Sequence, residues 1–381
     1  MNNKIRFFSL FVLIVMLFST FGASSALEIK SPSFDVGVKS AVLMEANTGT
    51  ILYAKNESIP LPPASVTKIM TLLLVFEAIE DGRLKLDDML TASENASSMG
   101  GSQIFLKVGE EMSVDDLIKS VIIASANDAA VTLAENIAGS IEGFVDMMNK
   151  RADELNMKNT HFENATGLDD TVANHLTSAY DIALMSKELI KHKKVSEYAT
   201  IWMDTIRNGE FGLTNTNRLV RFYKGITGLK TGYTAKSGYC ISATAKRGEM
   251  ELIAVVMGAE SSEIRNNCVA KLLDFGFANY KLYRSNGEKI ENIYIMDGIT
   301  DYTSGEYNDF LHLENISNNE LKKEIYIYDS LKAPINKGEI IGKVNYIING
   351  EIVAQEDIIC CDNVKKISFL EYIFKVIENF L

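Results

Sequence analysis

The sequence predicts a layered α/β (α+β) domain over residues 27–283, a small all-β domain over residues 284–361 and an amphipathic helix over residues 362–381. In the first region, strand-like segments at both ends enclose a run of helical segments. That order predicts a sheet flanked by helices, with a helical insert. The second region consists of short strand-like segments separated by turn dipeptides at Asn286-Gly287, Asp297-Gly298, Lys337-Gly338 and Asn349-Gly350.

The first 26 residues have the pattern of an export signal. Lys4 and Arg6 supply the positive start, residues 7–18 are nearly all apolar, and Ser24-Ser25-Ala26 is a small-residue cleavage site. An uncleaved anchor helix is the alternative, but the apolar run is short for a membrane span. We therefore expect cleavage after Ala26 and a protein that works outside the cytoplasm.

Composition restricts the class of protein. The chain has 381 residues, 47% of them hydrophobic and 23% charged, which suits a globular protein with room for two cores. The net charge is −12 and no basic cluster occurs, so nucleic acid is not an expected partner. Because the cysteines and histidines lack metal-ligand spacing, we expect no metal and no cofactor; these residues are Cys240, Cys268, Cys360, Cys361, His161, His175, His192 and His312.

The elements of the first domain follow from periodicity and turn signals. Residues 38–55 predict a hairpin with strands at 40–44 and 51–54, and residues 83–112 are expected to be irregular. Ser113 and the acidic residues after it open a helix that runs through Ile123. The other expected elements are helices at 128–138, 141–156, 178–192 and 269–280 and strands at 239–245 and 251–258.

The chain is organised around the stretch Pro63-Ala-Ser-Val-Thr-Lys-Ile-Met-Thr71, which predicts the first turn of a buried helix ending near Gly82. Ser65 and Lys68 are three residues apart and share one helix face, so Lys68 Nζ can reach the Ser65 hydroxyl. A lysine with a lowered pKa can activate a serine nucleophile. A capping serine followed by a first-turn lysine is the structural alternative. The apolar surroundings of Lys68 favour the chemical interpretation.

Two further motifs can join this pair. Ser125-Ala126-Asn127 lies between two apolar helices, so its polar groups are expected to face an interior. In Lys230-Thr231-Gly232, a glycine at a strand start lets a substrate backbone approach beside a positive charge. Each motif is weak alone, because most such triplets are helix caps or turns. Ser93-Glu94-Asn95 and Ser317-Asn318-Asn319 fit the pattern of the Ser125 motif, and Lys236-Ser237-Gly238 has a form similar to the Lys230 motif.

Taken in this order, the three motifs resemble those of the low-molecular-mass penicillin-binding proteins, the serine D-alanyl-D-alanine carboxypeptidases. The resemblance covers roughly residues 30–360 and includes Asn164-Ala-Thr-Gly-Leu168 and Gly228-Leu-Lys-Thr-Gly-Tyr-Thr234. It implies the penicillin-binding, β-lactamase-like transpeptidase fold. The implied substrate is a peptidoglycan stem peptide ending in D-Ala-D-Ala, with β-lactam antibiotics as inhibitors.

The resemblance also implies roles for catalytic residues. Ser65 attacks the carbonyl of the terminal D-Ala–D-Ala bond and Lys68 acts as its general base. Ser125 relays the proton to the leaving D-alanine. Backbone N–H groups of Ser65 and Tyr233 form the oxyanion hole, and water then hydrolyses the acyl-enzyme.

The same resemblance implies the substrate-binding residues. Asn127 holds the substrate amide, and Lys230 tunes the electrostatics of the site. Thr231 binds the terminal carboxylate, with Arg265 as a further partner, and Gly232 admits the substrate backbone. Without the resemblance, Arg265 would be read as a surface or ion-pair arginine.

The C-terminal segment over residues 363–381 predicts an amphipathic helix that lies in a membrane interface. Its length and charges do not suit a span, and apolar burial would supply most of the anchoring. A helix docked on the β domain is the alternative. The expected apolar face consists of Ile367, Phe369, Leu370, Tyr372, Ile373, Phe374, Val376, Ile377, Phe380 and Leu381.

Three other functions compete with a carboxypeptidase. A class A β-lactamase needs a Glu-x-x-Leu-Asn loop for fast deacylation, and Glu154-Leu155-Asn156 lacks that spacing. A non-catalytic envelope protein that binds peptidoglycan is disfavoured by the intact Ser65 and Lys68 pair. A Ser-His-Asp hydrolase is disfavoured because no Gly-x-Ser-x-Gly occurs.

Overall fold

The computed structural model describes residues 34, 36–169, 172–316 and 319–378. The signal peptide predicted over residues 1–26 lies outside these residues. The described chain divides into two compact units after Tyr280, against a sequence-based boundary at residue 283. Each unit is considered by itself.

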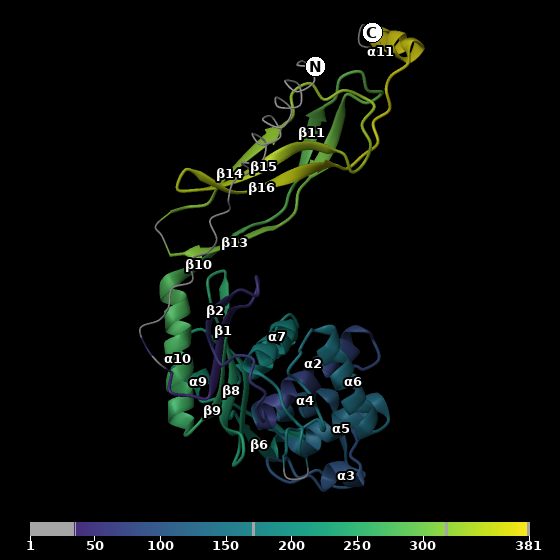
Figure 1. Cartoon of the computed structure of the whole chain (residues 1–381). Coiled ribbons are helices and arrows are strands. Elements are labelled where there is room, and N and C mark those ends of the chain that lie inside the picture. The colour runs from purple at the N-terminus through teal and green to yellow at the C-terminus, as the bar shows by residue number, and fades with distance from the viewer. Residues whose placement is uncertain (1–33, 35, 170–171, 317–318, 379–381) are drawn as a thin grey trace, which may run out of the picture. The chain divides into compact units, whose positions relative to one another are not determined.

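The first unit is built on a five-stranded antiparallel sheet in the order β2-β1-β9-β8-β7. Helix α10 packs on the sheet through β9 and β8, and α7 packs through β9 and β1. Figure 1 shows α10 on one side of the sheet and the other long helices on the opposite side. The strands are β1 (Ser40–Glu45), β2 (Ile51–Lys55), β7 (Ile226–Thr234), β8 (Gly238–Arg247) and β9 (Met250–Ala259).

The helical part of this unit surrounds α2, in which every residue from Lys68 to Phe76 is buried. A helix that is apolar on all sides belongs in a core, and α2 contacts α5, α6, α7 and β7. Helices α4 and α7 each begin after a capping serine. The hydroxyls of Ser113 and Ser178 accept hydrogen bonds from the backbone N–H groups of the residues three positions later. The helices are α2 (Lys68–Glu80), α4 (Val114–Ile123), α5 (Asn127–Ala138), α6 (Ile141–Glu154), α7 (Ala179–Leu189), α8 (Lys193–Ala199) and α10 (Ser262–Asn279).

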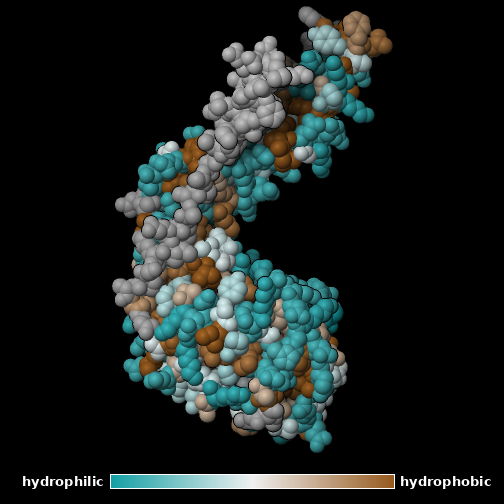
Figure 2. Space-filling model, in the orientation of Figure 1, coloured by the Kyte–Doolittle hydropathy of each residue, from teal (hydrophilic) through white to brown (hydrophobic). Residues whose placement is uncertain are grey.

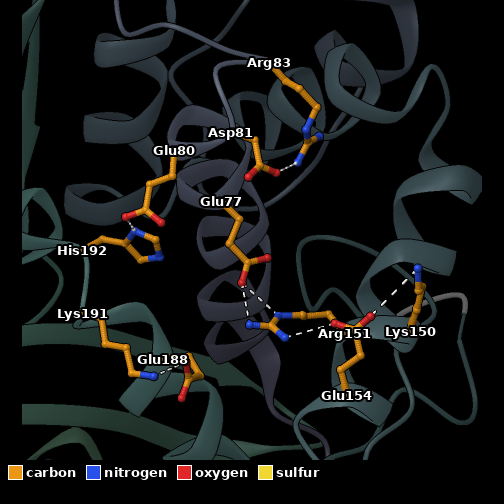
Figure 3. Close-up of polar contacts among 10 residues, drawn as sticks. All are labelled: Glu77, Glu80, Asp81, Arg83, Lys150, Arg151, Glu154, Glu188, Lys191 and His192. Carbon is orange, nitrogen blue, oxygen red and sulfur yellow. Dashed lines mark hydrogen bonds and ion pairs between the residues drawn. The ribbon is translucent and has the colours of Figure 1, made fainter. Parts of the chain in front are cut away.

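Ion pairs fix the exposed end of α2 (Figure 3). The Glu77 carboxylate accepts two bonds from the Arg151 guanidinium of α6, at 2.9 and 2.8 Å, and Arg151 also donates to Glu154 at 3.1 Å. Glu80 lies 2.9 Å from His192 Nδ1. Half-exposed pairs of this kind contribute little to stability, and the Glu77–Arg151 pair joins α2 to α6 at the surface.

The expectations for residues 83–112 and for the last helix of this unit are wrong. Residues 83–112 are not simply irregular: strands β3 (Met89–Thr91) and β4 (Glu111–Ser113) pair, and Ser93 caps the short helix α3 (Glu94–Ser97). Helix α10 begins at Ser262 rather than Val269, because its polar first turns carry no apolar period, although the Ser261 hydroxyl caps them. A hairpin of β5 (Met203–Ile206) and β6 (Phe211–Thr214) was not foreseen.

The second unit is all-β, as predicted. Its five-stranded sheet has the order β11-β12-β16-β15-β14, and β10 (Tyr280–Ser285) pairs with β13 (Phe310–Asn315). The β15–β16 connection is a tight turn in which Asn349 and Gly350 both have positive φ, as the Asn-Gly dipeptide predicts. The sheet strands are β11 (Lys289–Tyr294), β12 (Tyr302–Glu306), β14 (Lys322–Ile327), β15 (Ile340–Ile348) and β16 (Glu351–Cys360).

The terminal helix α11 (Phe369–Glu378) begins later than the predicted residue 363. The reason is that Val364 and Lys366 form β-bridges with Ile335 and Gly298, so this part of the chain is extended. Val364 also belongs to the core of the β unit. The last three residues of the predicted helix, 379–381, lie outside the described part of the chain.

Candidate active site

A cavity of about 390 Å³ lies at the edge strand β7, where the three sequence motifs meet. Ser65 comes from the turn before α2, Ser125 from the α4–α5 connection, and Thr231 and Gly232 from β7. Lys68 and Lys230 are fully buried beside it. The lining residues are Ser65, Ser102, Ser125, Thr216, Arg218, Thr231, Gly232, Tyr233, Tyr239, Ser262 and Arg265.

Ser65 does not lie in the first turn of an α-helix, as expected, but in the 3₁₀ turn η1 (Ala64–Thr67) that precedes α2. Ala64 has φ of +49°, a left-handed conformation that L residues rarely adopt outside constrained sites. Pro62 and Pro63 have no backbone N–H, so neither can donate a hydrogen bond to continue a helix backwards from this turn. The turn still places Ser65 and Lys68 together, because a 3₁₀ turn also brings residues i and i+3 onto one face.

Lys68 is arranged to act as a base. Its Nζ lies 2.8 Å from Ser65 Oγ and 2.8 Å from the Thr166 carbonyl oxygen, to which it donates. Burial, and then the nearby Lys230 charge, hold the pKa of Lys68 well below that of an ordinary lysine, while Asp128 opposes the shift. A neutral Lys68 amine has a lone pair for the Ser65 proton.

Lys230 and Ser125 form a second polar pair. Lys230 Nζ donates to Ser125 Oγ at 2.8 Å and to the Thr231 carbonyl at 3.0 Å. Burial, followed by the Arg265 charge, lowers the pKa of Lys230 to about 7. Ser125 itself has φ of +63° and lines the cavity.

Asn127 is held in one orientation with a free acceptor. Its Nδ2 donates to the Gly100 carbonyl at 2.7 Å, and its backbone N–H donates to the Ser102 carbonyl at 2.7 Å. Among the described residues, no donor reaches its buried Oδ1. A buried acceptor without a donor carries a free-energy cost, which a donor N–H would remove.

Gly232 allows β7 to approach η1, the turn that carries Ser65. A Cβ at this position would lie 2.8 Å from the Pro63 carbonyl oxygen and 3.0 Å from the Ser65 nitrogen. Any larger residue would therefore push β7 away from Ser65. Thr231 Oγ1 donates to Thr216 Oγ1 at 2.8 Å, which fixes the hydroxyl at the cavity wall.

One end of the cavity is cationic. Arg265 is 5% exposed and packs over the Tyr239 ring, and Arg218 lies on the same wall. Burial lowers the pKa of Arg265 to about 10, so the guanidinium stays charged at neutral pH. Tyr233 stacks on Tyr239 with ring centroids 4.3 Å apart and is 56% exposed, so its ring forms part of the rim.

The charges of Lys230 and Arg265 give a pH prediction. Lys230 must be protonated to carry its charge, so kcat/KM should fall as pH rises through its lowered pKa. Arg265→Gln removes a positive charge that disfavours the Lys230 ammonium, and should move this alkaline limb to higher pH. The measurement is kcat/KM against pH for both proteins. An unmoved limb would show that Arg265 does not act on Lys230.

Several residues at the site were missed from sequence. Thr216 and Arg218 come from an irregular connection after β6, where no periodic signal exists. Asp128 was also missed, although it stands next to the Ser125 motif in the sequence. Its carboxylate accepts from the Ile104 and Leu106 N–H groups and so holds the loop that contacts Asn127.

Within the described residues, no group of three or more His, Cys, Asp or Glu side chains could hold a metal ion.

The comparisons with known proteins agree with this geometry. The D-alanyl-D-alanine carboxypeptidase family, peptidase S11, matches residues 26–261, and the penicillin-binding protein 5 C-terminal domain matches residues 277–366. The D-alanyl-D-alanine carboxypeptidase DacF of Bacillus subtilis is 44% identical over 344 residues, covering 88% of each chain. DacC of Escherichia coli is 34% identical over 369 residues, covering 93% of this chain and 90% of its own.

Solved structures give the same result. Penicillin-binding protein 5 of Haemophilus influenzae aligns with a TM-score of 0.72 at 31% identity, covering 88% of this chain and all of that one. Penicillin-binding protein D2 of Listeria monocytogenes, in an ampicillin-bound form, aligns with a TM-score of 0.60 at 32% identity over 65% of this chain and all of its own. The fold and the matches define a penicillin-binding serine hydrolase. The chain belongs to the D-alanyl-D-alanine carboxypeptidase family, which confirms the predicted fold and enzyme class.

Proposed function

We propose that this protein removes the terminal D-alanine from peptidoglycan stem pentapeptides through an acyl-enzyme on Ser65. The observation that carries the proposal is the contact between a fully buried Lys68 amine and Ser65 Oγ at 2.8 Å. The cationic end of the cavity, with Arg265 and Thr231, suits the free carboxylate of a C-terminal D-alanine. A carboxypeptidase requires such a partner for the terminal carboxylate of its substrate.

In the acylation step, Lys68 takes the Ser65 proton and Ser65 Oγ attacks the carbonyl of the penultimate D-alanine. Backbone N–H groups of Ser65 and Tyr233 stabilise the resulting oxyanion, and the close approach of Gly232 to the Ser65 nitrogen supports that pairing. The C–N bond then breaks. Ser125, in contact with Lys230, relays the proton that Lys68 took from Ser65 to the departing amine.

In the deacylation step, water attacks the Ser65 ester and releases the shortened stem peptide. Asn127 Oδ1 accepts the amide N–H of the acyl group, which satisfies its buried oxygen. A β-lactam would form the same ester on Ser65, since its amide carbonyl mimics the scissile bond. Water would hydrolyse this ring-opened ester on Ser65 only slowly.

Mass spectrometry of the penicillin adduct tests this assignment. A stoichiometric adduct on the tryptic peptide that contains Ser65 supports the proposal. An adduct on a peptide that contains Ser125 but not Ser65 would assign the nucleophile to Ser125. A protein that forms no adduct while releasing D-alanine would require a mechanism without the serine ester.

We further propose that the protein is exported and lies on the outer face of the cell membrane through its C-terminal helix. No described helix is long and apolar enough to cross a membrane. Helix α11 instead has no buried residue, and its exposed apolar side chains appear brown at the C-terminal end in Figure 2. Such a patch is unusual on a soluble protein and suits a membrane interface. The patch consists of Phe369, Leu370, Tyr372, Ile373, Phe374, Val376 and Ile377.

Deletion of residues 369–381 should abolish sedimentation of the protein with phospholipid vesicles and leave D-alanine release unchanged. The cut is placed after Ser368 because Val364 belongs to the core of the β unit. Because α11 carries Glu371, Lys375 and Glu378, its charges nearly cancel, and binding of the full chain should depend little on salt. A truncated protein that still sediments with vesicles would place the anchor elsewhere.

A further inference from the structure

A buried histidine lies behind the nucleophile turn, outside the cavity. His175 is 3% exposed, and its Nε2 is 2.8 Å from Thr67 Oγ1. Its Nδ1 accepts the Glu163 backbone N–H at 2.9 Å, so a neutral ring carries its proton on Nε2 and donates to Thr67. Thr67 Oγ1 in turn donates to the Ala64 carbonyl at 2.8 Å. These bonds connect His175 to the residue before Ser65.

The Ala64 carbonyl is the part of the turn that needs support. Ala64 has φ of +49°, and Gly167 packs so closely that a Cβ there would lie 1.8 Å from the Ala64 oxygen. A left-handed residue persists only where its surroundings determine it. The hydrogen bond from the Thr67 hydroxyl to the Ala64 carbonyl stabilises this conformation from within the turn. His175 in turn fixes the orientation of the Thr67 hydroxyl.

His175 also contacts the loop whose Thr166 carbonyl accepts a hydrogen bond from Lys68. This loop, of which the structure describes residues 163–169 and 172–175, supplies the Thr166 carbonyl that accepts from Lys68 Nζ at 2.8 Å. Its base is closed by the bond from Glu163 N–H to His175 and by the bond from Asn174 N–H to the Glu163 carboxylate at 2.8 Å. His175 therefore contacts both the turn that carries Ser65 and the base of the loop that holds Lys68.

We propose that His175 is a positioning residue for this reaction: through its contacts with Thr67 and the Glu163 backbone, it aligns Ser65 Oγ with Lys68 Nζ. The proposal rests on the proposed function of Ser65 and Lys68, and goes beyond it by adding a residue that touches neither substrate nor the reacting atoms. The ring must be neutral for this role, because an Nδ1–H would face the Glu163 N–H.

The surroundings of His175 keep the ring neutral. Burial lowers the pKa of His175 to about 4; Glu163 and Asp169 oppose the shift, while His161 and the Lys68 charge support it. A nitrogen-15 spectrum of the ring should therefore show one neutral tautomer, protonated on Nε2, from neutral pH down to about pH 5. A charged ring at pH 6 would contradict the proposed bond to Glu163.

The kinetic test compares His175→Leu, Thr67→Val and the double variant with the wild-type protein. Misplacement of a catalytic group by about 1 Å can cost roughly 10²-fold in rate, so each single variant should lose about that factor in the acylation rate constant, with little change in KM for the peptide. If His175 acts through Thr67, the two substitutions remove the same effect, and the double variant should be no slower than the slower single variant. Thr67→Ser, which keeps the hydroxyl, should restore most of the rate.

His161→Asn is the matched control, since His161 is an exposed histidine in the same part of the chain. If His175→Leu fails to fold, the comparison of Thr67→Val with Thr67→Ser decides the matter. Equal rates for those two variants, or losses that multiply in a folded double variant, would overturn the role of His175. If the wild-type protein is not acylated at all, the proposed function fails rather than this inference alone.

Discussion

Ser65→Ala should abolish covalent labelling by penicillin and lower kcat for D-alanine release by roughly 10⁶-fold, the loss that removal of the nucleophile causes in other serine hydrolases. The physical reason is that Lys68 Nζ lies 2.8 Å from Ser65 Oγ, and among the described residues no other hydroxyl has this contact. The measurements are labelling on a denaturing gel and D-alanine release. The fold should persist, because the substitution only removes an oxygen that faces the cavity.

Ser98→Ala is the control for this experiment, because it removes an exposed serine hydroxyl from the same unit. That variant should be labelled as fast as the wild-type protein. Labelling retained in Ser65→Ala would place the nucleophile elsewhere, and Ser125 would then be the next residue to substitute.

Lys68→Met should lower the acylation rate constant by roughly 10²–10⁴-fold, the range attributed to general base catalysis. Methionine fills much of the volume of the buried side chain but has no amine to take the Ser65 proton. Noncovalent binding of the substrate should change much less, since the proposed binding residues Thr231, Arg265 and Asn127 remain in place. Stopped-flow acylation by a fluorescent penicillin separates the two quantities.

Lys85→Met is the matched control, because Lys85 is an exposed lysine beyond the end of α2. It should acylate at the wild-type rate. If Lys68→Met loses less than about tenfold while folded, Lys68 is not the base, and the amine of Lys230, in contact with Ser125, would take that role.

The sequence predicted the pairs of this site better than its surroundings. Ser65 and Lys68 are brought together by local geometry, so their spacing alone indicated the contact, even though the turn is 3₁₀ rather than α. Lys230 and Ser125 are 105 residues apart, and only the resemblance to a family suggested that they meet. Their contact depends on how β7 packs against the helices, which no local pattern encodes.

What the sequence did not indicate lies in irregular segments. Thr166 contributes a backbone carbonyl, and backbone contacts are nearly independent of residue type. His175 was set aside because its sequence neighbours suggested neither a ligand nor a catalytic base. Its role depends on tertiary contacts with Thr67 and Glu163, which lie 108 and 12 residues away. The late start of α11 has the same origin, since the bridge of Val364 to Ile335 overrides local helical preference.

The most direct test of the central claim is the rate of D-alanine release from a stem pentapeptide ending in D-Ala-D-Ala, measured beside the rate of β-lactam hydrolysis by the same protein. Rapid D-alanine release with slow β-lactam turnover is the result expected of a Ser65 carboxypeptidase. Fast β-lactam turnover without D-alanine release would contradict it and identify a β-lactamase. Penicillin labelling of Ser65 without D-alanine release and without β-lactam hydrolysis would also contradict the claim. That result would indicate a binding protein that has lost deacylation.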